Sequence, residues 1–97
     1  MDEKFKMFEK WYLKRKKEWY KRGIYVDESG LSEFGHQYWI KVHSKNGIGN
    51  IILYESNGYY WIDFEAGNID YDNIFCKGNI DFDDISFYEK EFIKYMI

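Results

Sequence analysis

The sequence predicts a two-layer α+β domain in which an amino-terminal helix, four or five antiparallel strands in a meander and a carboxy-terminal helix follow in order. Two observations lead to this prediction. Apolar residues recur at helical spacing near both ends of the chain, and runs rich in β-branched and aromatic residues, separated by Asn-Gly or Gly-Asn, lie between them. A chain of 97 residues can bury one modest core, so residues 1–97 are expected to form a single domain.

The first predicted element is a helix over residues 3–22. Its apolar stripe is interrupted only at Arg15 or Lys16 and consists of Phe5, Phe8, Tyr12 and Trp19. Gly23 follows two cationic residues and is a typical helix end.

Three consecutive turn signals predict the meander. After a short strand at 24–26 and a loop at 29–36, strands are expected at 38–44, 48–55, 59–66 and 69–76, with turns at Asn46-Gly47, Asn57-Gly58 and Gly67-Asn68. Two-residue turns would place Val42 opposite Ile51, Ile40 opposite Leu53, Leu53 opposite Ile62, and Phe64 opposite Tyr71. One face then collects Tyr38, Ile40, Val42, Ile51, Leu53, Tyr60, Ile62, Phe64, Ile69, Tyr71 and Phe75.

A final helix carries an apolar stripe of Ile85, Tyr88, Phe92 and Met96, and Asp81 or Asp83 could cap its start. We expect both helices to cover the apolar face of the sheet. The other face would then be open to a partner.

That other face carries the candidate binding residues. The predicted register puts Trp39, Tyr54, Trp61 and Ile74 in one row, Glu65 opposite Asp70, and Asp63 opposite Asp72. Like charges directly opposite each other cost up to about 1 kcal/mol per pair, which suggests that a basic partner or a cation compensates them. The candidate partner-binding residues are Trp39, Lys41, His43, Tyr54, Trp61, Asp63, Glu65, Asp70 and Asp72.

Two structural explanations compete with this functional one. Cross-strand aromatic pairs can simply stabilise a small sheet. Alternatively, the first helix could cross this face, so that Lys14–Lys17 neutralise the carboxylates.

The net charge of −3 hides an asymmetry. Residues 1–22 hold nine Lys and Arg against four acidic residues, whereas the remainder holds five Lys against thirteen. An acidic body argues against nucleic acid as the main ligand and favours a basic protein partner whose association is fast and salt-sensitive. A nucleic-acid-binding module that uses the basic helix is the alternative.

No catalytic or cofactor-binding constellation is evident. Cys76 and His43 fall on the same face but are separated by two intervening strands, and the glycines belong to turns rather than to a phosphate-binding loop. Carboxylates on a flat sheet converge poorly on Ca²⁺ or Mg²⁺. We therefore expect a binding protein without enzymatic activity, cofactor or metal.

Other features of the sequence bear on where the protein is located and whether it forms dimers. The single cysteine excludes an internal disulfide, and neither a signal peptide nor an apolar run of about 18 residues is apparent. These features predict a cytoplasmic protein with no membrane association. An exposed strand edge leaves both a monomer and a homodimer open.

Four features together resemble a known type of small protein. They are the order of elements, the aromatic basic first helix ending near Trp19, the runs 38–42 and 51–58, and the aromatic-acidic helix from Phe82 to Tyr95. The chain is similar to small immunity proteins of bacterial polymorphic-toxin and contact-dependent growth inhibition systems, in particular the TriTu-like type. The resemblance covers nearly the whole chain but rests on element order and composition, so no family site residue is transferred.

The resemblance implies a cytoplasmic antitoxin that binds a cognate toxin domain, often a basic nuclease, and blocks its active site or substrate groove. Acidic side chains would then mimic phosphates. A phage anti-defence protein that acts as an acidic nuclease inhibitor would use the same physics, and the sequence does not separate the two.

Overall fold

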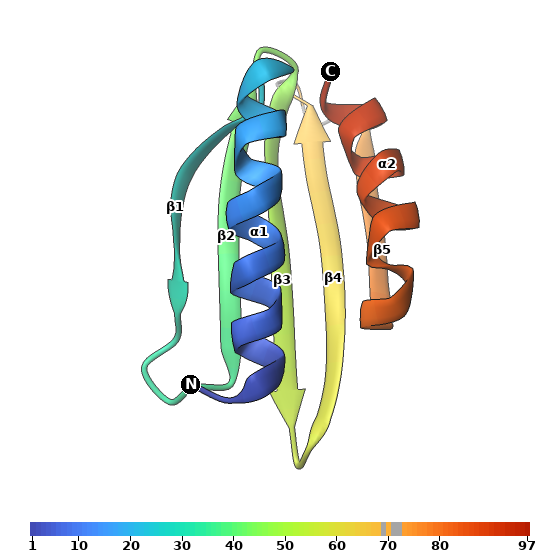
Figure 1. Ribbon diagram of the computed structural model, residues 1–97. Coiled ribbons are helices and arrows are strands. Elements are labelled where there is room, and N and C mark those ends of the chain that lie inside the picture. Colours follow the sequence, from blue (N-terminus) through green and yellow to red (C-terminus); the bar gives the residue numbers. More distant parts are fainter. Residues whose placement is uncertain (69, 71–72) are drawn as a thin grey trace.

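The computed structural model describes residues 1–68, 70 and 73–97, and it has the predicted order of elements (Figure 1). The elements are α1 (Glu3–Lys21), β1 (Tyr25–Leu31), β2 (Gln37–Ser44), β3 (Gly47–Ser56), β4 (Tyr59–Asn68), β5 (Ile74–Ile80), a 3₁₀ turn η1 (Phe82–Asp84) and α2 (Ile85–Met96). The five strands form one antiparallel sheet in chain order.

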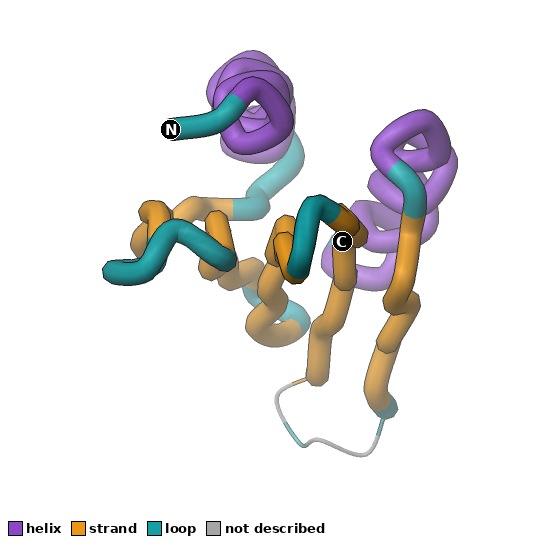
Figure 2. Tube along the Cα trace, turned by 90° about the horizontal axis from the view of Figure 1, so that it is seen from below, coloured by secondary structure: helices purple, strands orange, loops and turns teal. Residues whose placement is uncertain are grey.

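Both helices pack on the same face of the sheet, as expected. Figures 1 and 2 show α1 over the middle strands and α2 over β4 and β5, with the opposite face of the sheet uncovered. The predicted stripe of α1 is buried against the sheet. At the start of this helix, the Asp2 carboxylate accepts a hydrogen bond from the backbone N–H of Phe5 at 3.0 Å. The molecule is therefore a two-layer α+β domain.

The helices are also joined to each other. The Glu89 carboxylate is buried and lies 2.6 Å from Nε of Arg15, and the same oxygen accepts a hydrogen bond of 2.9 Å from the indole N–H of Trp19. Arg15 thus occupies the interruption in the apolar stripe because it has an ionic partner in α2. The N-cap of α2 is Asp84 instead of the expected Asp81 or Asp83, and its side chain makes no capping hydrogen bond.

The hairpin between β3 and β4 agrees with the prediction in every pair. Leu53 lies opposite Ile62 and Ile51 opposite Phe64. The turn residues Asn57 and Gly58 both have positive φ, 52° and 82°, which a two-residue turn of this kind requires.

The register between β2 and β3 differs from the prediction by two residues. Ile40 lies opposite Ile51 instead of Leu53, and the loop is Lys45-Asn46 instead of Asn46-Gly47. In this register the loop contacts the residue that follows α2, since the Asn46 side chain donates a hydrogen bond of 2.8 Å to the carbonyl oxygen of Ile97. Since the displacement is even, the alternation of faces survives, and the predicted apolar residues of β2 and β3 are buried on one face.

The prediction for the last hairpin is wrong. Gly67-Asn68 is not a two-residue turn, because β4 continues through both residues and β5 begins only at Ile74. A Cβ atom on Gly47 would lie 2.0 Å from the carbonyl oxygen of Gly67. Position 47 therefore requires glycine, because the backbone of β3 passes close to Gly67, which stays inside β4.

This correction changes every pair between β4 and β5. Phe64 lies opposite Lys77 instead of Tyr71, and Ala66 lies opposite Phe75. The predicted core positions Ile69 and Tyr71 lie outside the described residues.

Strand β1 is longer than predicted, since residues 29–31 were expected to be loop and instead pair with β2. The Ser29-Gly30 signal was misleading because both residues pack on neighbours. Ser29 shares a hydrogen bond of 3.1 Å with the Tyr12 hydroxyl, and a Cβ on Gly30 would touch the ring of Trp39 at 3.6 Å. A bulge interrupts the pairing between Val26 and Glu28.

Candidate protein-binding face

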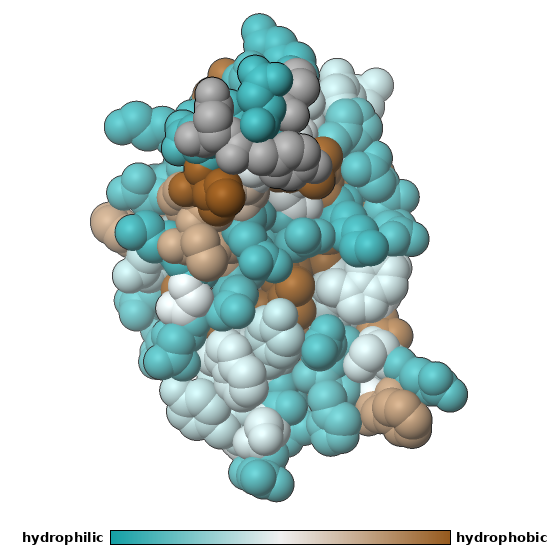
Figure 3. Space-filling view, turned by 180° about the vertical axis from the view of Figure 1, so that it is seen from behind, coloured by the Kyte–Doolittle hydropathy of each residue, from teal (hydrophilic) through white to brown (hydrophobic). Residues whose placement is uncertain are grey.

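The candidate site is the face of the sheet that neither helix covers, which we call the outer face. Strand alternation and the observed register bring together Trp39, Lys41, His43, Ile48, Asn50, Ile52, Tyr54, Tyr59, Trp61, Asp63 and Glu65. Figure 3 shows this face, with pale aromatic residues gathered toward one end and hydrophilic residues around and between them. Seven of the nine candidate residues lie here: Trp39, Lys41, His43, Tyr54, Trp61, Asp63 and Glu65.

Aromatic rings form the centre of the candidate site. Tyr54 and Trp61 lie opposite each other and stack, with ring centroids 5.2 Å apart and an interplanar angle of 12°. Tyr59 extends the group, with its ring 5.6 Å from Trp61. The predicted single row of Trp39, Tyr54 and Trp61 is wrong, because Trp39 lies opposite Ile52, two positions along β3 from Tyr54.

The acidic part of the site is smaller than predicted. Asp70 lies in an exposed turn after β4, and Glu65 faces Cys76 across the strands instead of Asp70. The predicted pair of Asp63 with Asp72 involves a residue outside the described part of the chain. Of the four predicted carboxylates, Asp63 and Glu65 lie on described strand positions of the outer face, and Glu65 is not opposed by Asp70.

These two carboxylates differ in their surroundings. Asp63 faces the bulge in β5, where it accepts a hydrogen bond of 3.0 Å from the backbone N–H of Asn79. No cation lies within ion-pair distance of Asp63 or Glu65 among the residues that the structure describes. The pKa of the Tyr54 hydroxyl is raised, first by burial and then by the negative charges of Asp63 and Glu65. The two carboxylates therefore act electrostatically on the aromatic centre.

The cationic candidates are instead paired with acidic residues of β1. Lys41 lies 3.1 Å from a Glu28 oxygen and 5.5 Å from the ring centre of Trp39. His43 was expected beside Glu65, but its Nδ1 lies 2.6 Å from Asp27. The outer face thus has side-chain partners for its acidic residues at the β1 edge, whereas Asp63 and Glu65 on β4 have no cationic partner among the described residues.

The position of α1 decides one of the alternatives left open by the sequence. Because α1 packs on the opposite face, Lys14–Lys17 do not neutralise the outer-face carboxylates. These lysines lie instead near β1 on the helix side of the molecule.

Two structural features bear on metal binding and on membrane insertion. In residues 1–68, 70 and 73–97, no group of three or more His, Cys, Asp and Glu is arranged to hold a metal ion. Neither α1 nor α2 is long and apolar enough to cross a membrane. Comparison of the chain with protein-family models, with curated proteins and with solved structures finds no match.

Proposed function

We propose that this protein is a cytoplasmic inhibitor of the immunity type, which binds a basic toxin domain through its outer face. The observation that carries the proposal is an uncovered sheet face on which the Tyr54–Trp61 stack lies beside Asp63 and Glu65, two carboxylates with no cationic partner among the described residues. Aromatic anchors with adjacent charge are typical of the energetic centre of a protein interface.

The chemistry of this face suits a basic partner. Lys or Arg residues of the partner could pair with Glu65 and Asp63, while the rings of Tyr54 and Trp61 lose their water against its surface. If the partner is a nuclease, the carboxylates would occupy positions that substrate phosphates normally take. Binding would block access to the substrate groove without a catalytic group or a cofactor in this chain.

The first test is co-purification. The tagged protein is expressed with the product of the gene next to its own, as neighbouring toxin and immunity genes would require, and the complex is captured at low salt. A stoichiometric basic protein that is released as the salt concentration rises is the expected result.

Charge reversal then locates the surface. Glu65→Lys is the sharpest variant, because Glu65 makes no ion pair with a described residue and its loss should leave the fold intact. We expect it to weaken the complex by at least about tenfold, which corresponds to about 1.4 kcal/mol. The matched control is Glu91→Lys, an exposed acidic residue on α2, which should leave binding unchanged.

Other outcomes would point elsewhere. Equal effects of both reversals would mean that net charge, not this face, controls the association. Recovery of nucleic acid would favour the basic helix as the binding element. A captured subunit of a host defence nuclease in place of a neighbouring toxin would favour the phage anti-defence alternative, which uses the same face.

A further inference from the structure

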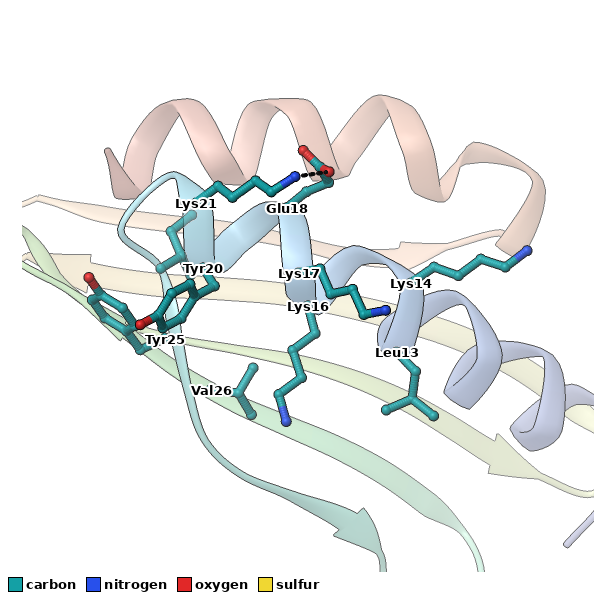
Figure 4. Close-up of a pocket in the computed structure, with 10 residues that line it drawn as sticks. Leu13, Lys14, Lys16, Lys17, Glu18, Tyr20, Lys21, Tyr25 and Val26 are labelled. Atoms are coloured by element: carbon teal, nitrogen blue, oxygen red, sulfur yellow. Dashed lines mark hydrogen bonds and ion pairs between the residues drawn. The ribbon is translucent and has the colours of Figure 1, made fainter.

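A second surface, of opposite charge, lies on the helix side of the molecule. An open groove of about 930 Å³ runs between α1 and the edge strand β1 (Figure 4). Figure 1 shows β1 to one side of α1, so neither helix fully covers this strand. The helical layer is therefore narrower than the sheet and leaves the edge strand β1 partly uncovered.

The groove has an apolar floor. Ile24 is buried beneath it, and Leu13, Tyr20 and Tyr25 line it while 51%, 68% and 41% exposed. Val26 lies half-buried on the β1 side. So many large apolar side chains around one depression are typical of an interaction surface.

The rim of the groove is strongly basic. Lys14, Lys16, Lys17 and Lys21 line it, with Glu18 as the only acidic residue among the lining side chains. Lys21 lies 3.5 Å from Glu18, and within the described part of the chain the other three lysines have no ion-pair partner. The excess of uncompensated positive charge favours an acidic ligand.

The acidic residues of β1 do not cancel this charge. The Asp27 carboxylate lies 2.6 Å from His43 and that of Glu28 lies 3.1 Å from Lys41, and both partners belong to the outer face. The strand therefore directs its negative charge to one side of the sheet and leaves the lysines of α1 on the other.

We propose that this groove binds an acidic amphipathic helix of a partner protein. Such a helix would lie beside α1 and over β1, bury its apolar side on Leu13 and Val26, and pair its carboxylates with Lys16 and Lys17. A helix fits better than an added strand, because the bulge at Asp27 disrupts the β1 edge on which a strand would pair. Aliphatic residues on the floor also favour an amphipathic protein segment over a phosphate backbone.

The test uses a defined probe and the full-length protein. The probe is a fluorescein-labelled peptide of about four helical turns, with leucines on one side of the helix and glutamates elsewhere, titrated by fluorescence anisotropy at low salt. A control peptide has the same composition with the leucines distributed around the helix. We expect saturable binding of the first peptide and at least about tenfold weaker binding of the second.

Matched variants place the binding in the groove. Lys16→Glu with Lys17→Glu should weaken binding at least about tenfold, whereas Lys6→Glu with Lys10→Glu changes the net charge equally on exposed positions outside the groove and should change affinity less than about threefold. The Leu13 side chain is exposed, so Leu13→Ser should leave the fold intact, and it should weaken peptide binding severalfold.

Three results would overturn the proposal. One is the absence of saturable peptide binding, and another is equal affinity for the two peptides. The third is tighter binding of single-stranded DNA or of phosphatidylglycerol vesicles than of the peptide, with loss in the Lys16→Glu, Lys17→Glu variant, which would assign the groove to nucleic acid or to an anionic membrane. Glu65 does not line the groove, so Glu65→Lys should leave peptide binding unchanged.

Discussion

Replacing Arg15 with alanine should destabilise the fold by about 3 kcal/mol, although neighbouring lysines on the same helix should be replaceable at little cost. Arg15 holds the Glu89 carboxylate at 2.6 Å, and the Glu89 side chain is only 6% exposed. Without the guanidinium, a buried carboxylate would keep the indole N–H of Trp19 as its hydrogen-bond donor. Removing one partner of a buried ion pair costs about 3–5 kcal/mol. We take the lower end because the Arg15 side chain is 34% exposed, so water already screens the pair.

Neutralising the acid should cost less. Glu89→Gln keeps the volume and an acceptor for the indole N–H of Trp19 but loses the charge assistance, a difference of about 1 kcal/mol. In the Glu89→Gln background, the further loss of Arg15 should cost about 1 kcal/mol, because no buried charge is then left without its partner. The double-mutant cycle therefore predicts a coupling energy of about 2 kcal/mol.

Equilibrium urea unfolding, followed by tryptophan fluorescence, measures these differences. Lys10→Ala, an exposed position on the same helix, is the control and should stay within about 0.5 kcal/mol of the parent protein. The reasoning fails if Arg15→Ala costs less than about 1 kcal/mol, or if its cost is the same with Glu and with Gln at position 89.

Three further predictions concern the sheet. Gly47→Ala should cost about 3 kcal/mol or more in urea unfolding, because its Cβ would lie 2.0 Å from a backbone oxygen, whereas Gly30→Ala meets nothing closer than 3.6 Å and should be mild. Asp63→Asn should lower the pKa of Tyr54 but leave it above the ordinary value, since burial is the larger cause, and NMR titration of the tyrosine ring carbons would detect a pKa that fails to move. Backbone and histidine hydrogen bonds lower the pKa of Glu55, so the stability it contributes is present above the ordinary carboxyl pKa and is lost as the pH falls through the lowered one. Glu55→Gln should therefore show a smaller loss of stability between neutral and acidic pH, and an unchanged acid dependence would contradict this account.

Much of the fold was predictable because its signals are periodic. The stripe of α1 and the alternation along β2, β3 and β4 depend on many residues at once, so a two-residue error between β2 and β3 left the faces correct. The last hairpin depended on one dipeptide, Gly67-Asn68. A Gly-Asn dipeptide inside a strand cannot be distinguished by sequence from the same dipeptide in a turn, and here β4 continues through both residues.

The candidate site suffered from the same local error. Its aromatic centre, Tyr54 with Trp61, came from a hairpin whose turn is unambiguous, and the structure has that pair. The carboxylate pairs came from the misassigned turn and are not present for Glu65. The ion pair of Arg15 with Glu89 could have been predicted from the sequence. Opposite charges interrupt the apolar stripes of the two helices, and both helices pack on one face of the sheet.

That ion pair also has a kinetic consequence. Every strand pairs with its neighbour in sequence, so the sheet can form from successive hairpins that close short loops. The bonds from Glu89 to Arg15 and to Trp19 join positions 74 and 70 residues apart, and they require both ends of the chain to be docked on a sheet that already exists. An interaction formed so late governs how slowly the native state opens more than how quickly it forms. Loss of the Glu89 carboxylate should therefore raise the unfolding rate more than it lowers the folding rate.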